Sequence, residues 1–177
     1  NKSALIAEKK SMPIKFSDPV LSSVAVTPVK VKAVKDGNTE NPVDTDKIHV
    51  KVVANTFGFM DSQYDVLISG CCNRTLKDNQ KTLKFLHDHI YKIDSKVGEV
   101  TSAYVQNIPL SDLGVDGNGT AECLIFEADI MKSYNLAVFN QYHANKIDQH
   151  SIGLRYVSID IAINDPDSPK EIEFWNK

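Results

Sequence analysis

The sequence predicts a mainly β domain in which antiparallel strands are covered by a few packed helices. Apolar and polar residues alternate over residues 48–52, which is typical of a half-buried strand. Residues 97–105 and 121–126 predict a strand pair, because the glycine-rich residues 114–119 between them suit a turn. Only one segment, residues 129–146, carries apolar residues at helical spacing.

The chain before residue 48 is expected to be an N-terminal extension, partly irregular, spanning residues 1–47. Four prolines and the polar run 35–41 interrupt it. The valines at positions 24, 26, 29 and 31 suit edge strands, where proline is tolerated. The domain proper is therefore placed at residues 48–177.

Further elements follow in order along this domain. Residues 65–68 predict a second short strand, residues 73–79 a short helix or loop, and residues 83–89 a third strand that ends in a polar cluster. After the helix, apolar residues alternate from Ile152 to Ile163 and change face between Tyr156 and Val157. This slip predicts a β-bulge, and the polar residues 164–167 then end the strand.

Composition limits the classes of partner. The 177 residues include 20 Lys plus Arg and 23 Asp plus Glu, a formal net charge of −3, so no broad basic field favours nucleic acid. No apolar stretch approaches the roughly 20 residues that span a bilayer, and no leader pattern is present, so we expect a cytoplasmic protein without a membrane partner. The three cysteines, two of them adjacent at Cys71 and Cys72, do not form a disulfide framework and are expected to be reduced.

Serine and histidine residues are the candidates for chemistry. A serine becomes a good nucleophile only beside a base, and Ser151 follows the predicted helix while His87 and His89 share one face of a predicted strand. The same two histidines could instead hold a metal ion with His143 or His150 as third ligand, but the His-Glu-x-x-His spacing of many zinc hydrolases is absent. His150 neighbours Ser151 in a predicted strand, so the two side chains should project to opposite faces.

Three segments, taken in order, resemble the head maturation proteases of tailed phages, a family related in fold to herpesvirus assemblins. The first is residues 55–70, with an aspartate and a glycine turn after a core strand. The second is residues 83–89 followed by 96–100, similar to the segment that delivers the catalytic histidine and returns through a glycine. The third is His-Ser-Ile-Gly-Leu-Arg-Tyr at residues 150–156, similar to the nucleophile motif. Together they cover about residues 55–163.

The resemblance implies a herpesvirus-protease-like antiparallel β barrel and assigns roles to single residues. Ser151 corresponds to the nucleophile and His89 to the general base, with His87 as the alternative base. Gly153 would let a substrate strand approach, and Arg155 would help to hold the oxyanion. The third triad member is unassigned; its candidates are Asp88, Glu127, Asp129 and Asp148.

The resemblance also implies an activity and its partners. We expect a serine endopeptidase that needs no cofactor or metal and cleaves phage scaffold protein, the major capsid protein and itself during procapsid maturation. It would self-associate and act in the host cytoplasm, inside the procapsid. The alternative is a catalytically inactive structural or scaffolding component of the procapsid with the same fold. Family members continue into further core structure, so we expect residues 164–177 to leave the domain without its C-terminal strand.

Overall fold

The computed structural model describes residues 2–12, 15–16, 20–21, 25–30 and 43–176, with side chains for residues 2–12 and 46–176. The chain divides into two compact units, one of residues 17–151 and one that combines residues 1–16 with 152–177. Each unit is described by itself below. The division assigns part of the expected N-terminal extension to each unit.

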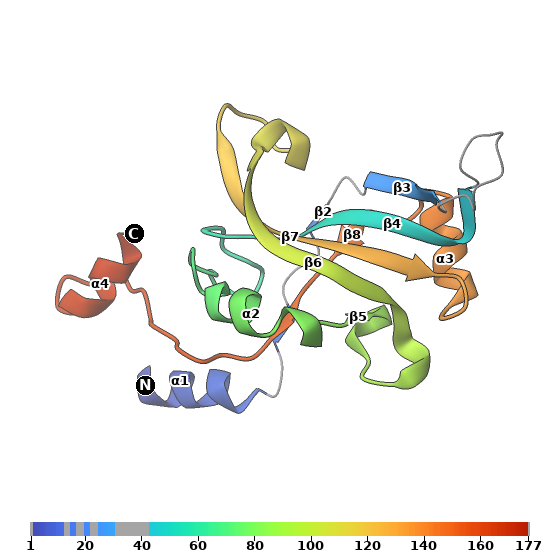
Figure 1. Cartoon of the computed structure of the whole chain (residues 1–177). Helices are drawn as coiled ribbons and strands as arrows, with labels where there is room; N and C mark the ends of the chain where they lie inside the picture. Colours follow the sequence, from blue (N-terminus) through green and yellow to red (C-terminus); the bar gives the residue numbers. More distant parts are fainter. Residues whose placement is uncertain (1, 13–14, 17–19, 22–24, 31–42, 177) are drawn as a thin grey trace. The chain divides into compact units, whose positions relative to one another are not determined.

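The larger unit is built on an antiparallel sheet (Figure 1). The strand order is β3-β4-β7-β6-β5, with four strands of six residues or more and a two-residue strand at one edge. The strands are β3 (Ala25–Lys30), β4 (Val43–Thr56), β5 (Phe85–Leu86), β6 (Lys96–Pro109) and β7 (Thr120–Met131). The antiparallel sheet, the strand at 48–52 and the strand pair around the glycine-rich turn are thus confirmed.

The sheet is open, so the predicted barrel is wrong. A barrel needs its two edge strands to pair, but in the described part of the chain β3 and β5 are opposite edges. β5 cannot extend, because after Leu86 the chain turns into the 3-10 helix η2 (His87–His89). The valine-rich, proline-containing segment forms the edge strand β3, as predicted for residues 26 and 29; residues 24 and 31 lie outside the described residues.

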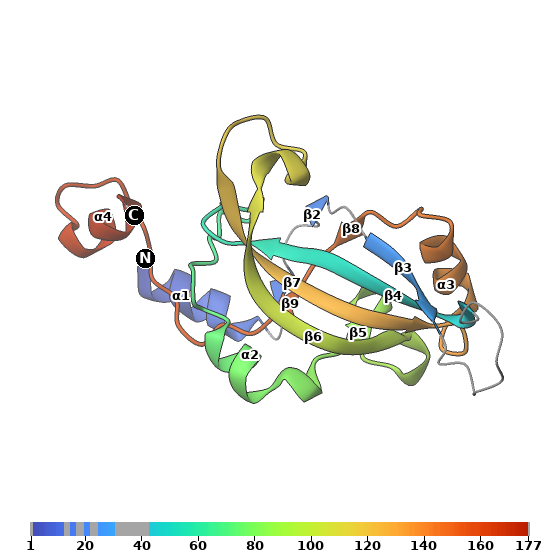
Figure 2. The same cartoon turned by 45° about the horizontal axis from the view of Figure 1, so that its top comes forward.

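Helix α3 (Leu136–His143) lies at the end of the sheet where β4 begins and β7 ends (Figures 1 and 2). Its buried side chains Val138, Phe139 and Tyr142 join the core cluster of the sheet. The helix starts at 136 rather than at the predicted 129, because β7 continues to Met131 and pairs with β4 as far as Lys47. The side chain of Asn135 caps the helix by accepting a hydrogen bond of 3.1 Å from the Val138 N–H.

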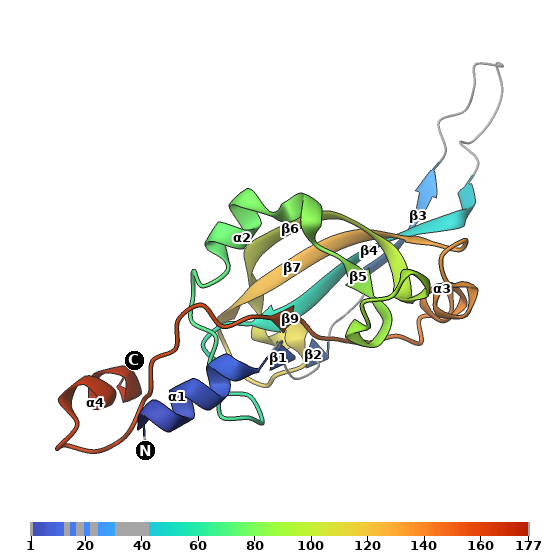
Figure 3. The ribbon, with the colours of Figure 1, turned by 90° about the horizontal axis from the view of Figure 1, so that it is seen from below.

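The buried apolar side chains follow the strand alternation and form two clusters, one with Ala128 and Ile130 of β7 and the other, on the opposite face of that strand, with Cys123 and Ile125. In β4, Ile48, Val50 and Val52 are buried, and Ile130 and Val97 meet them from β7 and β6. Figure 3 shows β4, β7 and β6 side by side from another direction.

Gly98 marks the closest approach of β6 to β7. A Cβ at this position would overlap the backbone carbonyl of Asp129 and lie 3.1 Å from the Ile130 Cα. The neighbour is main chain in a paired strand, so it cannot move aside cheaply. The glycine is required by space at this point of the ladder.

The predicted strand at 65–68 is wrong, because local hydrogen bonds form a tight turn at residues 61–65 and no ladder follows it. The Asp61 carboxylate accepts from the N–H groups of Gln63 and Asp65 at 2.9 and 3.0 Å, and Tyr64 has a left-handed φ of 60°. Only an isolated bridge between Met60 and Val66 forms. The neighbouring prediction is confirmed as α2 (Asn73–Asp78).

The predicted long strand at 152–163 is also wrong. Only β9 (Gly153–Leu154) forms, paired with the two-residue β1 (Lys15–Phe16), so the predicted bulge has no ladder to interrupt. This smaller unit also holds two helices that were not predicted, α1 (Lys2–Ser11) and α4 (Pro169–Trp175). The side chains of Lys2 and Glu171 form an ion pair between them.

Candidate active site

Ser151 and His89 meet although 62 residues separate them in the sequence. The His89 Nε2 atom lies 2.6 Å from the Ser151 Oγ atom, a hydrogen-bond distance. Ser151 directly follows β8 (Gln149–His150), which pairs with β2 (Val20–Leu21), and His89 ends the turn η2 after β5. Two short segments from different sheets therefore bring a hydroxyl and an imidazole together.

The turn that presents His89 has an unusual backbone. Asp88 and His89 have φ angles of 53° and 54°, in the left-handed region that residues with a Cβ seldom adopt. Two consecutive residues of this kind cost about 1–3 kcal/mol each where the backbone is strained, although Asp and His tolerate it better than most. Such strain persists only where surrounding contacts hold it, and it is concentrated at functional sites.

The environment keeps the His89 imidazole in its neutral form. Partial burial lowers the pKa of His89 below its usual value, and the nearby negative charge of Asp88 partly opposes this effect. At neutral pH the ring is therefore uncharged. In the tautomer protonated at Nδ1, Nε2 accepts the hydrogen bond from the Ser151 hydroxyl and is ready to take its proton.

His87 occupies a different environment. Its Nε2 atom lies 3.6 Å from the Asp88 carboxylate, and its side chain is exposed. The predicted strand over 83–89 is wrong beyond Leu86, so the two histidines do not share a strand face. Of the two, it is His89 that lies within hydrogen-bond distance of Ser151.

His150, which directly precedes Ser151, belongs to a buried aromatic cluster. Its Nε2 atom lies 2.7 Å from the Tyr142 hydroxyl, and its ring also contacts those of Phe85 and Phe126. Burial lowers the pKa of His150 to about 4 and raises that of Tyr142, so both groups are neutral. In the tautomer of His150 protonated at Nδ1, the tyrosine hydroxyl donates to Nε2.

This cluster links the two segments that carry the reactive groups. Phe85 is in β5, four residues before His89, and His150 is in β8, directly before Ser151. Helical spacing over residues 129–146 includes Tyr142, and strand alternation directs His150 away from Ser151, but neither pattern predicts the hydrogen bond between Tyr142 and His150. No local pattern carries that information, because the partners belong to different elements.

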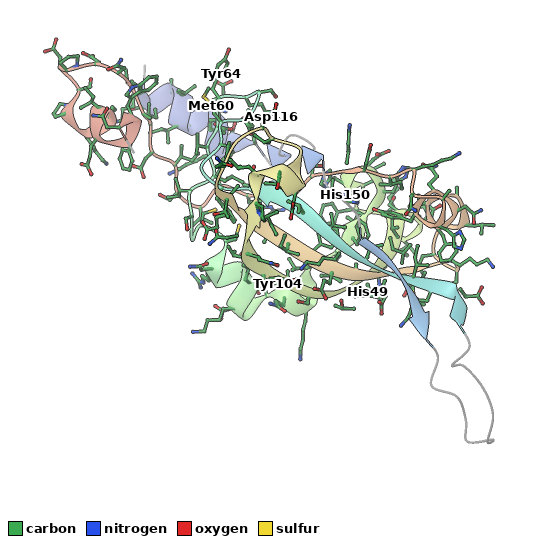
Figure 4. The ribbon with its side chains drawn as sticks, turned by 90° about the horizontal axis from the view of Figure 1, so that it is seen from above. His49, Met60, Tyr64, Tyr104, Asp116 and His150 are labelled. Carbon is green, nitrogen blue, oxygen red and sulfur yellow. The ribbon has the colours of Figure 1, made fainter. Side chains whose placement is uncertain are left out.

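Two of the four candidates for a third triad member, Glu127 and Asp129, interact with His49. Asp129 Oδ1 lies 2.8 Å from His49 Nδ1, and Glu127 Oε2 lies 3.5 Å from His49 Nε2. Glu127 also accepts a hydrogen bond of 2.8 Å from Tyr104. Figure 4 shows His49 and Tyr104 well apart from His150.

The remaining two candidates lie within two residues of a histidine in the sequence. Asp88 raises the pKa of His89 and Asp148 raises that of His150, in each case against the effect of burial. Asp88 is thus the carboxylate that acts electrostatically on the candidate base. The role of third triad member stays unassigned.

Gly153 and Arg155 lie in the smaller unit. Gly153 pairs with Phe16 between β9 and β1, and Arg155 lines a small cavity with Lys10, Ser11, Met12 and Tyr156. Their expected roles toward substrate and oxyanion stay predictions.

The part of the chain that the structure describes offers neither a three-ligand metal site nor a membrane-spanning helix. No three His, Cys, Asp or Glu side chains gather there as a metal-binding group, and His143, one proposed ligand, stacks on Phe139. Among the described helices, none combines the length and apolar character needed to cross a membrane.

Comparison with known proteins gives no match for this chain among family models, curated proteins or solved structures.

Proposed function

We propose that this chain is a serine endopeptidase of the phage prohead maturation type, in which Ser151 is the nucleophile and His89 the general base. The observation that carries the proposal is the 2.6 Å distance between His89 Nε2 and Ser151 Oγ. The lowered pKa of His89 supports it, because a general base must be unprotonated at the working pH. The left-handed backbone at His89 adds support, since strain of this kind is typical of functional sites.

The chemistry follows from these two groups. The Ser151 oxygen attacks the carbonyl carbon of the scissile peptide bond while Nε2 of His89 accepts the hydroxyl proton. The imidazolium then gives this proton to the departing amine, and the serine is left as an ester. Water attacks the ester with His89 again as base, which releases the acid product and restores the hydroxyl.

The substrates come from the resemblance in sequence. Scaffold protein, major capsid protein and the protease itself are the proposed targets, cut during procapsid maturation. Gly153, two residues after the nucleophile, would leave room for the substrate backbone, and Arg155 would stabilise the negative charge of the tetrahedral intermediate. The alternative, an inactive structural component of the procapsid, would keep the fold without reacting at Ser151.

A fluorophosphonate probe distinguishes these two functions. It reacts with activated serines, so the wild-type chain should be labelled at Ser151, as read by peptide mass mapping. Ser151→Ala should abolish labelling and His89→Ala should slow it severely. Ser69→Ala, which changes an exposed serine, and His87→Ala are the matched controls and should label normally. A folded wild-type chain that is not labelled at Ser151 would favour the inactive structural component.

A further inference from the structure

The adjacent cysteines Cys71 and Cys72 form a pair of thiols at the start of α2. Their Sγ atoms lie 3.7 Å apart. Cys71 is exposed and Cys72 is partly exposed, so the pair lies at the surface of the unit. Two thiolates bound at about 2.3 Å to one tetrahedral ion lie about 3.8 Å apart, so the observed spacing suits chelation.

Backbone hydrogen bonds hold this pair in place. The Cys71 N–H donates to Ile68 at 3.2 Å, and the carbonyl of Cys72 accepts from the Leu76 N–H at 2.9 Å as α2 begins. Gly70, with a φ of 80°, permits the turn immediately before the pair. The thiols are therefore attached to an ordered turn rather than to a free coil.

A disulfide between these two residues would be strained. Neighbouring Cα atoms are about 3.8 Å apart across a trans peptide bond, whereas disulfides usually join Cα atoms about 4.4–6.8 Å apart. Strain makes a disulfide easier to reduce. The stable state of the pair in a reducing compartment is the dithiol.

Binding of an ion releases the thiol protons, because metal and metalloid ions bind the thiolate form of cysteine.

We propose that Cys71 and Cys72 form a binding site for a thiophilic metal or metalloid ion that two sulfur ligands satisfy. The described part of the chain offers no group of three metal-binding side chains, so the ion must accept two protein ligands. Trivalent organic arsenic has this property. With phenylarsine oxide, two arsenic–sulfur bonds form, the arsenic–oxygen bond breaks, and both thiol protons leave in one water molecule.

Phenylarsine oxide is the probe for the test. We expect the native protein to gain one phenylarsenic group by intact mass, and peptide mapping to place it on Cys71 and Cys72. A dithiol such as 2,3-dimercaptopropanol should remove the group, whereas the same concentration of a monothiol should not, because chelation by two sulfurs resists competition by one. Cys71→Ser and Cys72→Ser should each lose the adduct.

Cys123 supplies an internal control. Cys123 is in β7, the strand between β4 and β6, and it is fully buried. Burial raises its pKa to about 11, so it should not react in the folded protein. Cys123→Ala should keep the adduct. An adduct that survives in Cys71→Ser, one that a monothiol removes from the wild type, or no adduct at all would overturn the proposal, and none of these outcomes depends on the activity of Ser151.

Discussion

Two histidines of this chain make nearly the same hydrogen bond to a hydroxyl in very different surroundings. His89 Nε2 lies 2.6 Å from Ser151 Oγ, and His150 Nε2 lies 2.7 Å from Tyr142 Oη. His150 is buried among aromatic rings, whereas His89 is half-exposed on a turn with a left-handed backbone. Ser151 and His150 are neighbours in the sequence, so adjacent residues belong to the serine–histidine pair and to the tyrosine–histidine pair.

The difference shows that the length of a hydrogen bond does not identify a reactive site. The tyrosine pair is buried away from solvent, and burial raises the pKa of Tyr142, so its proton stays on oxygen. The serine pair is partly exposed, and its histidine, the proposed base, is neutral although it lies outside the core. We expect the tyrosine pair to contribute to stability and the serine pair to reactivity.

The largest expected effect is on reactivity at the serine pair. Ser151→Ala should reduce peptide cleavage by about four to six orders of magnitude, the usual cost of losing a nucleophile or its base. Stability should change by only about 0.5 kcal/mol, because Ser151 is not buried. The double variant with His89→Ala should be no slower than either single one, because the two residues act as a unit. Processing rates and urea melts measure both effects; normal cleavage by Ser151→Ala would remove Ser151 from the mechanism.

The second largest expected effect is a loss of folding stability at low pH, and it comes from His150 of the tyrosine pair. The pKa of His150 is about 4 in the folded chain and near 6.5 when unfolded, so unfolding takes up a proton between these values. Stability from this group is complete above about pH 6.5 and is lost as the pH falls toward 4, by at most about 3 kcal/mol. Urea unfolding at several pH values should show this loss in the wild type. Phenylalanine does not titrate, so in His150→Phe the free energy of unfolding should depend less on pH between about 6.5 and 4. An equal dependence in the two proteins would show that His150 is not the group responsible.

Removing the tyrosine hydroxyl should have a smaller effect of the same kind. Tyr142→Phe leaves the buried His150 nitrogen without this donor, which costs about 1–3 kcal/mol. Tyr64→Phe is the control, because Tyr64 is 83% exposed and should change stability little. Phosphonate labelling of Ser151 in Tyr142→Phe should stay far closer to wild type than in His89→Ala. A loss of labelling without a loss of stability would show that the two pairs are coupled.

The smallest expected effect concerns the charge beside the base. Asp88→Asn removes the negative charge that raises the pKa of His89, while asparagine still tolerates the left-handed backbone. The pKa of His89 should fall further, so the labelling rate of Ser151 should stay high to a lower pH than in the wild type. The measurement is the pH dependence of labelling, with Asp94→Asn at an exposed position as control. A shift toward higher pH would mean that Asp88 acts on His89 in another way.

Strands with a long-range partner could be predicted from the sequence, and short segments without one could not. The alternation around Val50 and the turn between β6 and β7 follow from period and glycine content, and both are confirmed. Residues 65–68 have strand-like composition, but the Asp65 N–H donates to the carboxylate of Asp61, four residues earlier, and no ladder with a distant strand forms there. Ile130 fits both the helical spacing and the alternation of a strand. It lies in β7, because it pairs with Ile48 of β4.

The candidate site was predicted by resemblance rather than by spacing. Spacing alone left His87 and His89 equivalent, on a strand that ends before either of them. His87 and His89 differ because the backbone kinks at Asp88, between them. The sequence does not predict this kink, because aspartate is common in ordinary turns. The links from Tyr142 to His150 and from His49 to Asp129 join separate elements, so only the fold reveals them.

Gly98 has a consequence for the mutational tolerance of the chain. In a library covering every position, it should accept no other residue, because even the smallest side chain would meet the main chain of β7. Gly58, with a φ of 77° and open space around its Cβ position, should instead favour asparagine and aspartate as substitutes. Such a map of tolerance would report the spacing of β6 and β7 in living cells, whatever reaction the protein carries out.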